Sequence, residues 1–199
     1  VREDLIGSIV QVHSHFSERL FEVNPDKNQW RLDMDLSGYG STLMDLGPYP
    51  VNTVRFILQS DPIAVQATSA SVSTGFEDIP DERISFLMEL PNGTQANCSV
   101  SLNAYHSNYL RLIGKSGEIR IEPAFRPSQD RRLIIKKNGC RSVLDFEQIN
   151  QMTEEFDYFA TCVFENNKPS ASGEMGLKDM KILKSIFESA SKNQRITVS

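Results

Sequence analysis

The sequence predicts an α+β domain of two layers, in which a broad, largely antiparallel, open-faced sheet carries helices on one face. Two patterns predict this fold. Most of residues 5–146 is a succession of short segments in which apolar and polar residues alternate, and residues 150–192 have helical periodicity. Many consecutive strands followed by helices are typical of this two-layer class.

Strands are predicted in segments of alternating polarity that are bounded by turn residues. They span residues 5–20, 63–74, 83–90, 94–103, 109–113, 118–121, 133–136 and 142–146, with a last short strand near 196–198. Asn92-Gly93 and Asn138-Gly139 are typical of tight hairpins, because both residue types tolerate positive φ. In residues 94–103 one side is apolar and the other carries only Ser, Asn and Gln, so one sheet face is small and polar.

Three helices are predicted to cover the other face of the sheet. The first is kinked or tightened at Gly47 and Pro48 and becomes regular from about Val51 to Leu58, because Pro48 and Pro50 lack amide donors. The second spans residues 150–166 and the third begins near Ser172. Apolar stripes on these two helices are predicted to be buried: Met152, Phe156, Phe159, Ala160, Val163 and Phe164 on the second, and Leu177, Met180, Leu183, Ile186, Phe187 and Ala190 on the third.

The composition indicates one globular domain over residues 1–199. The chain is 39% hydrophobic and 24% charged, which gives enough apolar residues for a core. A formal charge of −5 argues against nucleic acid or an anionic membrane as a partner. Three scattered cysteines imply neither a disulfide framework nor a zinc cluster, and no signal or membrane-spanning pattern is present, so a cytoplasmic location is predicted.

The candidate site lies in residues 30–59, where Asp45 and Tyr49 are four residues apart. On a helix this spacing places a carboxylate and a phenol on one face, where they could bind a hydroxylated ligand. A structural alternative stays open, in which Asp45 caps backbone amides and Tyr49 packs in a helix start. His13 and His15 would share one face of a strand, but with no nearby cysteine we predict a solvated face there and no metal site.

Several short motifs resemble those of the glucose–fructose oxidoreductase, inositol dehydrogenase and dihydrodiol dehydrogenase family. Trp30-Arg31 and residues 40–49 are similar to its Trp-Arg pair and to its Asp-x-Gly-x-His or Asp-x-Gly-x-Tyr signature. The family's glycine triplet is reduced here to Gly40 between Tyr39 and Ser41. Further similar motifs follow in the family's order over nearly the whole chain: residues 91–93, 113–117, 155–159 and 172–177.

The resemblance implies the C-terminal substrate-binding and oligomerisation domain of an NAD(P)-dependent oxidoreductase that acts on a sugar, cyclitol or related polyol. By the same resemblance, Tyr49 would exchange a proton with the reacting hydroxyl or carbonyl, and Asp45 would bind the substrate or orient the tyrosine. Arg31 and Trp30 would contact the substrate. A free phenol ionises near pH ~10, so Tyr49 would need a nearby cation, which in this family is a lysine outside this chain.

The cofactor half of such an enzyme is not found in these residues. They contain no GxGxxG between a strand and a helix, and no Glu-Lys-Pro segment. NAD or NADP would therefore be bound mainly by an N-terminal Rossmann domain that this chain lacks, and the 199 residues alone are predicted to be inactive. A non-catalytic ligand-binding or scaffold module remains the alternative. The resemblance also implies a homo-oligomer formed through the open sheet face. Substrate identity, NAD against NADP and oligomer size are not determined.

Overall fold

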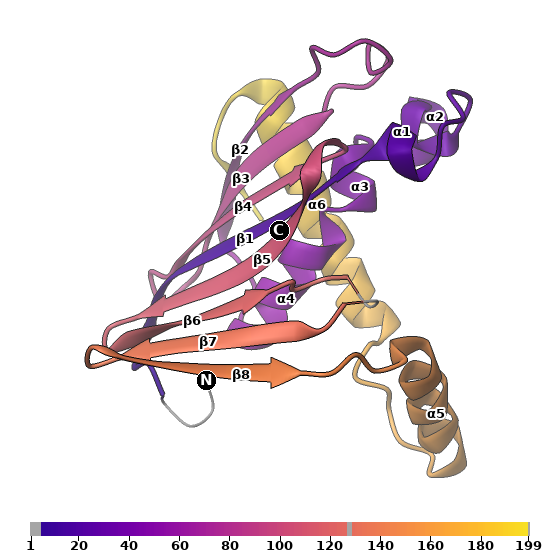
Figure 1. The fold of residues 1–199 in the computed structure, drawn as a ribbon. Coiled ribbons are helices and arrows are strands. Elements are labelled where there is room, and N and C mark those ends of the chain that lie inside the picture. Colours follow the sequence, from indigo (N-terminus) through magenta and orange to yellow (C-terminus); the bar gives the residue numbers. More distant parts are fainter. Residues whose placement is uncertain (1–4, 127–128, 199) are drawn as a thin grey trace.

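A nine-stranded open sheet forms one layer of the protein in a computed structural model that describes residues 5–126 and 129–198 (Figure 1). The strands lie in the order β8-β7-β6-β5-β1-β4-β3-β2-β9. Only β1 and β4 run parallel among the pairs of this sheet, and the other neighbours are antiparallel. The predicted fold class is therefore confirmed.

The strands match the predicted segments to within a few residues at most ends. Their bounds are β1 Ile9–Arg19, β2 Ala64–Ala70, β3 Arg83–Glu89, β4 Gln95–Ser101, β5 Asn103–Gly114, β6 Gly117–Glu122, β7 Arg131–Lys137, β8 Cys140–Phe146 and β9 Ile196–Thr197. The largest differences are that β5 begins six residues earlier than predicted, β1 begins four residues later and β2 ends four residues earlier. Asn138, Gly139 and Gly93 have positive φ, as the predicted hairpin turns require.

The two sheet faces differ in polarity as the alternation predicts. Side chains such as Val12, Phe86 and Val100 point into the core, whereas their strand neighbours His13, Ser85 and Ser99 lie on the other face. The core is made mainly from β1, β3, β4 and β5 together with the helices.

Helices α4, Pro48–Leu58, and α6, Gly173–Lys192, cover the apolar face (Figure 1). Val51 and Val54 of α4 are fully buried, and so are Leu183 and Ile186 of α6. The shorter helical elements are α1 Leu20–Val23, the 3-10 helix η1 Trp30–Leu32, α2 Met34–Ser37 and α3 Thr42–Asp45. Helix α1 continues directly from the end of β1.

The two prolines interrupt the central helix less than predicted. Regular helix begins at Pro48 and not at Val51, because Pro48 occupies the first helical position, where an amide donor has no intrahelical partner. Gly47 itself has helical φ and ψ angles of −62° and −31°. The tightening is local: the Tyr49 amide donates to the Leu46 carbonyl, three residues back, at 3.3 Å.

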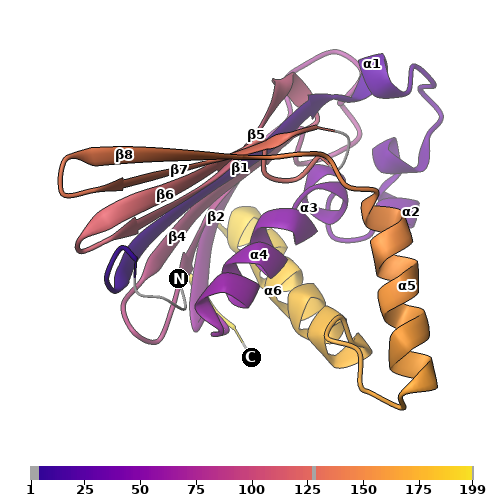
Figure 2. The same cartoon turned by 60° about the horizontal axis from the view of Figure 1, so that its bottom comes forward.

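Helix α5, Gln151–Phe164, forms at the predicted place but does not cover the sheet. Figure 2 shows it apart from α4 and α6, beyond the end of β8. Phe156, Phe159 and Val163 are 55–68% exposed, so the prediction that this stripe is buried is wrong. The same correction applies to Leu177, 59% exposed in the first half of α6. Periodicity predicted the helix, but no strand lies beneath its apolar side.

None of the helices in the described residues has the length and apolar character needed to cross a membrane.

Candidate functional site

The candidate site lies where η1, α3 and the start of α4 come together on the helix-covered side of the sheet. Asp33 accepts the Asp35 amide at 2.9 Å and so caps α2, which returns the chain from η1 towards α3. Gly38 and Gly40, with φ of +85° and +88°, complete the turn into α3. The Asp33 carboxylate is thus the N-cap of α2, and Asp35 lies in the first turn of that helix.

Arg31, Asp45 and Trp30 form one cluster. The Arg31 Nε donates to Asp45 Oδ2 at 2.7 Å, and the guanidinium lies 4.6 Å from the centre of the Trp30 ring. The Arg31 and Asp45 side chains are 27% and 15% exposed. Because a guanidinium has five N–H donors, the pairing at Nε leaves donors for a ligand while the two partners fix its plane. Asp45 binds this side chain and does not cap backbone amides.

Tyr49 occupies the first turn of α4 and packs against aromatic side chains. Its ring lies 5.0 Å from that of Phe16 in an edge-to-face arrangement and 5.8 Å from that of Phe125. Tyr49 is nevertheless 45% exposed. Aromatic packing therefore fixes the ring and leaves part of it open to a ligand. Phe16 and Phe125 were not predicted as its neighbours, because they are distant in sequence.

Gly47, between Asp45 and Tyr49, allows α3 and α4 to pack against α6. A Cβ at this position would lie 2.2 Å from the Leu43 carbonyl oxygen and 3.1 Å from Leu183 Cδ2. The first distance is too short for any side chain and the second would require Leu183 to move slightly, so a larger residue would displace the backbone between α3 and α4.

Asp81 is a buried carboxylate beside the site that sequence reasoning missed. It is 1% exposed and accepts the Ser41 amide at 2.7 Å and the Leu43 amide at 2.8 Å. Burial raises the pKa of Asp81 to about 6, and the hydrogen bonds from the two amides partly oppose this rise. An acidic residue before a strand carries no sequence signal of burial.

Glu82, the next residue, is equally buried but has the opposite shift. Although burial alone raises the pKa of Glu82, hydrogen bonds from the Val72 amide, from Ser73 and from Asn103 outweigh it and hold the pKa at about 2. The Glu82 carbonyl also accepts from Thr42 Oγ1 at 3.2 Å. Glu82 therefore connects α3 to the loop after β2 and to the start of β5.

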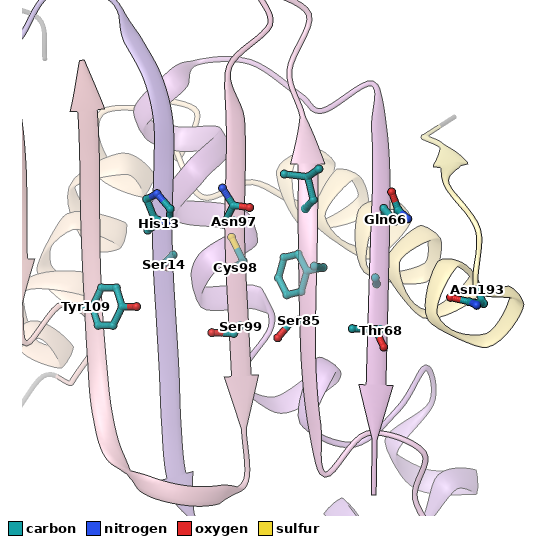
Figure 3. A pocket seen from close by; sticks show the side chains of 13 residues that line it. His13, Ser14, Gln66, Thr68, Ser85, Asn97, Cys98, Ser99, Tyr109 and Asn193 are labelled. Atoms are coloured by element: carbon teal, nitrogen blue, oxygen red, sulfur yellow. The ribbon is translucent and has the colours of Figure 1, made fainter. Parts of the chain in front are cut away.

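A broad hollow lies on the sheet face opposite the helices. It measures about 530 Å³ and is open, and its lining is mostly small and polar (Figure 3). His13, Ser85, Asn97, Ser99 and Tyr109 lie along it from neighbouring strands. Within residues 5–126 and 129–198, no group of three or more His, Cys, Asp or Glu side chains could hold a metal. The hollow is a shallow polar surface with few charges.

The His15 ring lies on this same face and is fixed by two hydroxyl groups. Its Nδ1 lies 2.8 Å from Ser99 Oγ and its Nε2 3.0 Å from Ser17 Oγ. Burial lowers the pKa of His15, so the neutral ring is favoured. His13 and His15 thus share a strand face as predicted, and His15 belongs to a hydroxyl network there.

Comparison with known proteins identifies the family of this chain. The family described as "GFO/IDH/MocA C-terminal domain" matches residues 1–120. This chain belongs to that family. The D-xylose 1-dehydrogenase [NADP(+)] of Haloarcula marismortui is 44% identical over 190 residues, which cover 96% of this chain and 52% of that protein. The chain thus spans about half the length of this curated relative.

Solved structures show the same fold. The aldose-aldose oxidoreductase of Caulobacter crescentus, complexed with glycerol, matches with a TM-score of 0.89 and 26% identity over 98% of this chain and 57% of its own. A 3-ketoreductase from Actinomadura kijaniata in complex with NADP matches with a TM-score of 0.79 and 18% identity over 94% of this chain and 56% of its own. The GFO/IDH/MocA C-terminal fold therefore covers nearly all of the chain, α5 included.

Proposed function

We propose that residues 1–199 are the substrate-binding and assembly domain of an NAD(P)-dependent oxidoreductase that transfers a hydride to or from a sugar or related polyol. The observation that carries the proposal is the Arg31–Asp45 ion pair together with the half-exposed Tyr49, which follows Asp45 by four residues, in a chain of this family. The dehydrogenase and aldose oxidoreductase named among its relatives support the reaction class. NAD or NADP would be bound mainly by a domain outside these residues.

Tyr49, Arg31 and Trp30 would have separate roles in the reaction. A nicotinamide cofactor, when bound, would supply hydride transfer at the carbon that carries the reacting oxygen. The Tyr49 hydroxyl would exchange the accompanying proton with that oxygen, since aromatic packing holds its ring while the residue is 45% exposed. The N–H donors of Arg31 that do not bind Asp45 would hold substrate oxygens, and the Trp30 ring would keep the guanidinium plane in place.

Replacing Tyr49 by Phe in the complete enzyme tests the proton-transfer role. The change removes one oxygen and keeps the aromatic packing, so we expect kcat to fall by roughly 100- to 10,000-fold with little change in melting temperature. Tyr105→Phe is the matched control, since Tyr105 is 75% exposed on the open sheet face. Unchanged turnover in Tyr49→Phe would remove the role and favour the non-catalytic alternative.

D-xylose with NADP⁺ is the first substrate pair to assay, because the 44% identical relative is named for it. Production of NADPH would be followed by absorbance, with NAD⁺ and a series of pentoses, hexoses and cyclitols in parallel. Reduction of neither cofactor with any of these polyols would contradict the reaction class.

We propose further that the open sheet face joins copies of this chain into a homo-oligomer. Its side chains are small and polar along β1 to β4, which allows close approach of a second sheet. A large charge in the centre of this face should disrupt it. Asn97→Arg is expected to give monomers in analytical ultracentrifugation, whereas Gln151→Arg at the start of α5 should not. Monomeric wild-type protein at high concentration would contradict the proposal.

A cytoplasmic location is proposed from the cysteines. Cys98, Cys140 and Cys162 are all free thiols, and two of them are buried. Unpaired cysteines are typical of a reducing compartment. Fractionation of the source cells with an antibody to this chain would test it.

A further inference from the structure

Asp81 is tied to the site by backbone hydrogen bonds, although it touches neither Tyr49 nor a ligand position. Each of its carboxylate oxygens accepts one amide at the start of α3: Oδ1 from Ser41 and Oδ2 from Leu43. The last residue of this four-residue helix is Asp45. A shift of the start of α3 by a fraction of an ångström would therefore move the Asp45 carboxylate.

Gly40 makes this close approach possible. It has a φ of +88°, and a Cβ added there would lie 2.6 Å from Asp81 Oδ2. No side chain fits between the backbone and the carboxylate. Two features therefore favour glycine at position 40: the positive φ, and the space that the Asp81 carboxylate occupies beside the backbone.

A closed series of hydrogen bonds connects Asp81 to both partners of the ion pair. The Ser41 hydroxyl donates to the Arg31 carbonyl, and the Arg31 Nε donates to Asp45 at 2.7 Å. The Asp45 amide donates back to the Ser41 carbonyl at 3.0 Å. Ser41 therefore positions both Arg31 and Asp45, and Asp81 in turn holds Ser41.

We propose that Asp81 is a positioning residue, whose ionised carboxylate fixes Ser41 and the start of α3 so that Arg31 and Asp45 pair beside Tyr49. The importance of the Arg31–Asp45 pair for turnover rests on the proposed function. The role of Asp81 in holding the pair in place does not. The ionised form accepts both amides equally. A protonated or amide side chain places a hydrogen towards one of the two donors and loses that bond.

Several charged groups lie on the elements that neighbour Asp81. They are Arg31 on η1, Asp45 on α3, and Glu82 and Arg83 at the start of β3. Glu82 has a pKa of about 2 and stays ionised, whereas burial raises the pKa of Asp81 to about 6. The geometry of the ion pair should therefore change with pH in the range where Asp81 titrates.

The first test uses steady-state kinetics of the complete enzyme with Asp81→Asn. We expect kcat/KM at pH 8 to fall about tenfold or more, mainly through kcat, because small displacements in a site cost rate. We also expect loss of the wild-type decline as the pH falls through about 6. Asp78→Asn, three residues away and exposed, is the matched control. Wild-type kcat/KM and pH profile in Asp81→Asn would overturn the proposal.

A second measurement does not depend on turnover. Trp30 is the single tryptophan of these 199 residues, and its ring contacts the Arg31 guanidinium. Emission of the full-length protein, after subtraction of its Trp30→Phe variant, should change with a midpoint near pH 6 in the wild type and not in Asp81→Asn. If no sugar is turned over but this transition occurs, the proposed function fails and the positioning role stands. A flat wild-type signal from pH 5 to 8 would contradict the positioning role directly.

Discussion

The C-terminal half of α6 and the whole of α5 have similar apolar stripes but opposite surroundings. Ile182, Leu183 and Ile186 of α6 are at most 1% exposed, whereas Phe156 and Phe159 of α5 are more than half exposed. Both helices begin at a residue whose side chain caps the first turn, Ser172 for α6 and Asn150 for α5. Their local sequences therefore do not explain the difference.

Tertiary contacts account for the different burial of the two helices. The Arg55 guanidinium of α4 pairs with Asp179 of α6 and with Asp61 at 2.8 Å, which anchors α6 beside α4. The Ser189 hydroxyl, buried near the other end of α6, accepts the Ala67 amide of β2 at 2.9 Å. Helix α5 follows β8, an edge strand whose side chains are exposed. The large apolar side chains of α5 are therefore left exposed.

The largest expected effect is that of a cavity beneath α6. Ile186→Ala removes three carbons from a fully buried position, and we expect the free energy of unfolding to fall by about 2–5 kcal/mol. Urea denaturation followed by circular dichroism measures this loss. A loss below about 1 kcal/mol would mean that α6 is not part of the cooperative core, and the contrast with α5 would disappear.

Two glutamates have the same low pKa, although one is buried and the other is exposed. Glu82 is buried and Glu174 is fully exposed in the first turn of α6, and each has a pKa of about 2. Because the folded-state pKa of Glu82 is below its ordinary value of 4.5, its contribution to stability is present above pH 4.5 and is lost as the pH falls towards 2.

Acid unfolding of single variants tests this difference. Glu82→Gln should flatten the dependence of the unfolding free energy on pH between 4.5 and 2, because the ionisable group is gone. Glu174→Gln should follow the wild-type curve closely, since hydrogen bonds of an exposed carboxylate compete with water. Equal changes in the two variants would show that burial of Glu82 is not what matters.

The smallest expected effect is on α5. Phe156→Ser should change the free energy of unfolding of this domain by less than about 0.5 kcal/mol, because the ring is 68% exposed and makes few contacts to lose. The same denaturation experiment, run beside Ile186→Ala, measures it. Destabilisation as large as that of Ile186→Ala would mean that α5 packs against the domain in solution.

Much of the fold could be predicted because strand alternation and hairpin residues are local signals. Asn138-Gly139 and Asn92-Gly93 set turns through their own conformations, and the flanking residues supply the alternation. Strand order is different. The parallel pairing of β1 with β4 brings Gln11 opposite Gln95, and no local pattern encodes which strands meet across such a distance.

Some residues of the candidate site could be predicted from sequence motifs, and others could not. Trp30, Arg31, Asp45 and Tyr49 were found through motifs, and the structure brings the first three together. Their catalytic and binding roles remain predictions. Asp81 and Glu82 were missed, because the amides that hold them belong to loops and helix starts more than eight residues away in the chain.

The α+β class, the polar and apolar faces of the sheet and the positions of the three main helices could all be predicted, because they follow from the conformational preferences and polarity of neighbouring residues. The burial of the C-terminal half of α6, the exposure of α5 and the opposite pKa shifts of Asp81 and Glu82 depend on tertiary contacts. Burial and hydrogen bonding depend on which distant segments surround a side chain, and a sequence pattern does not specify those neighbours.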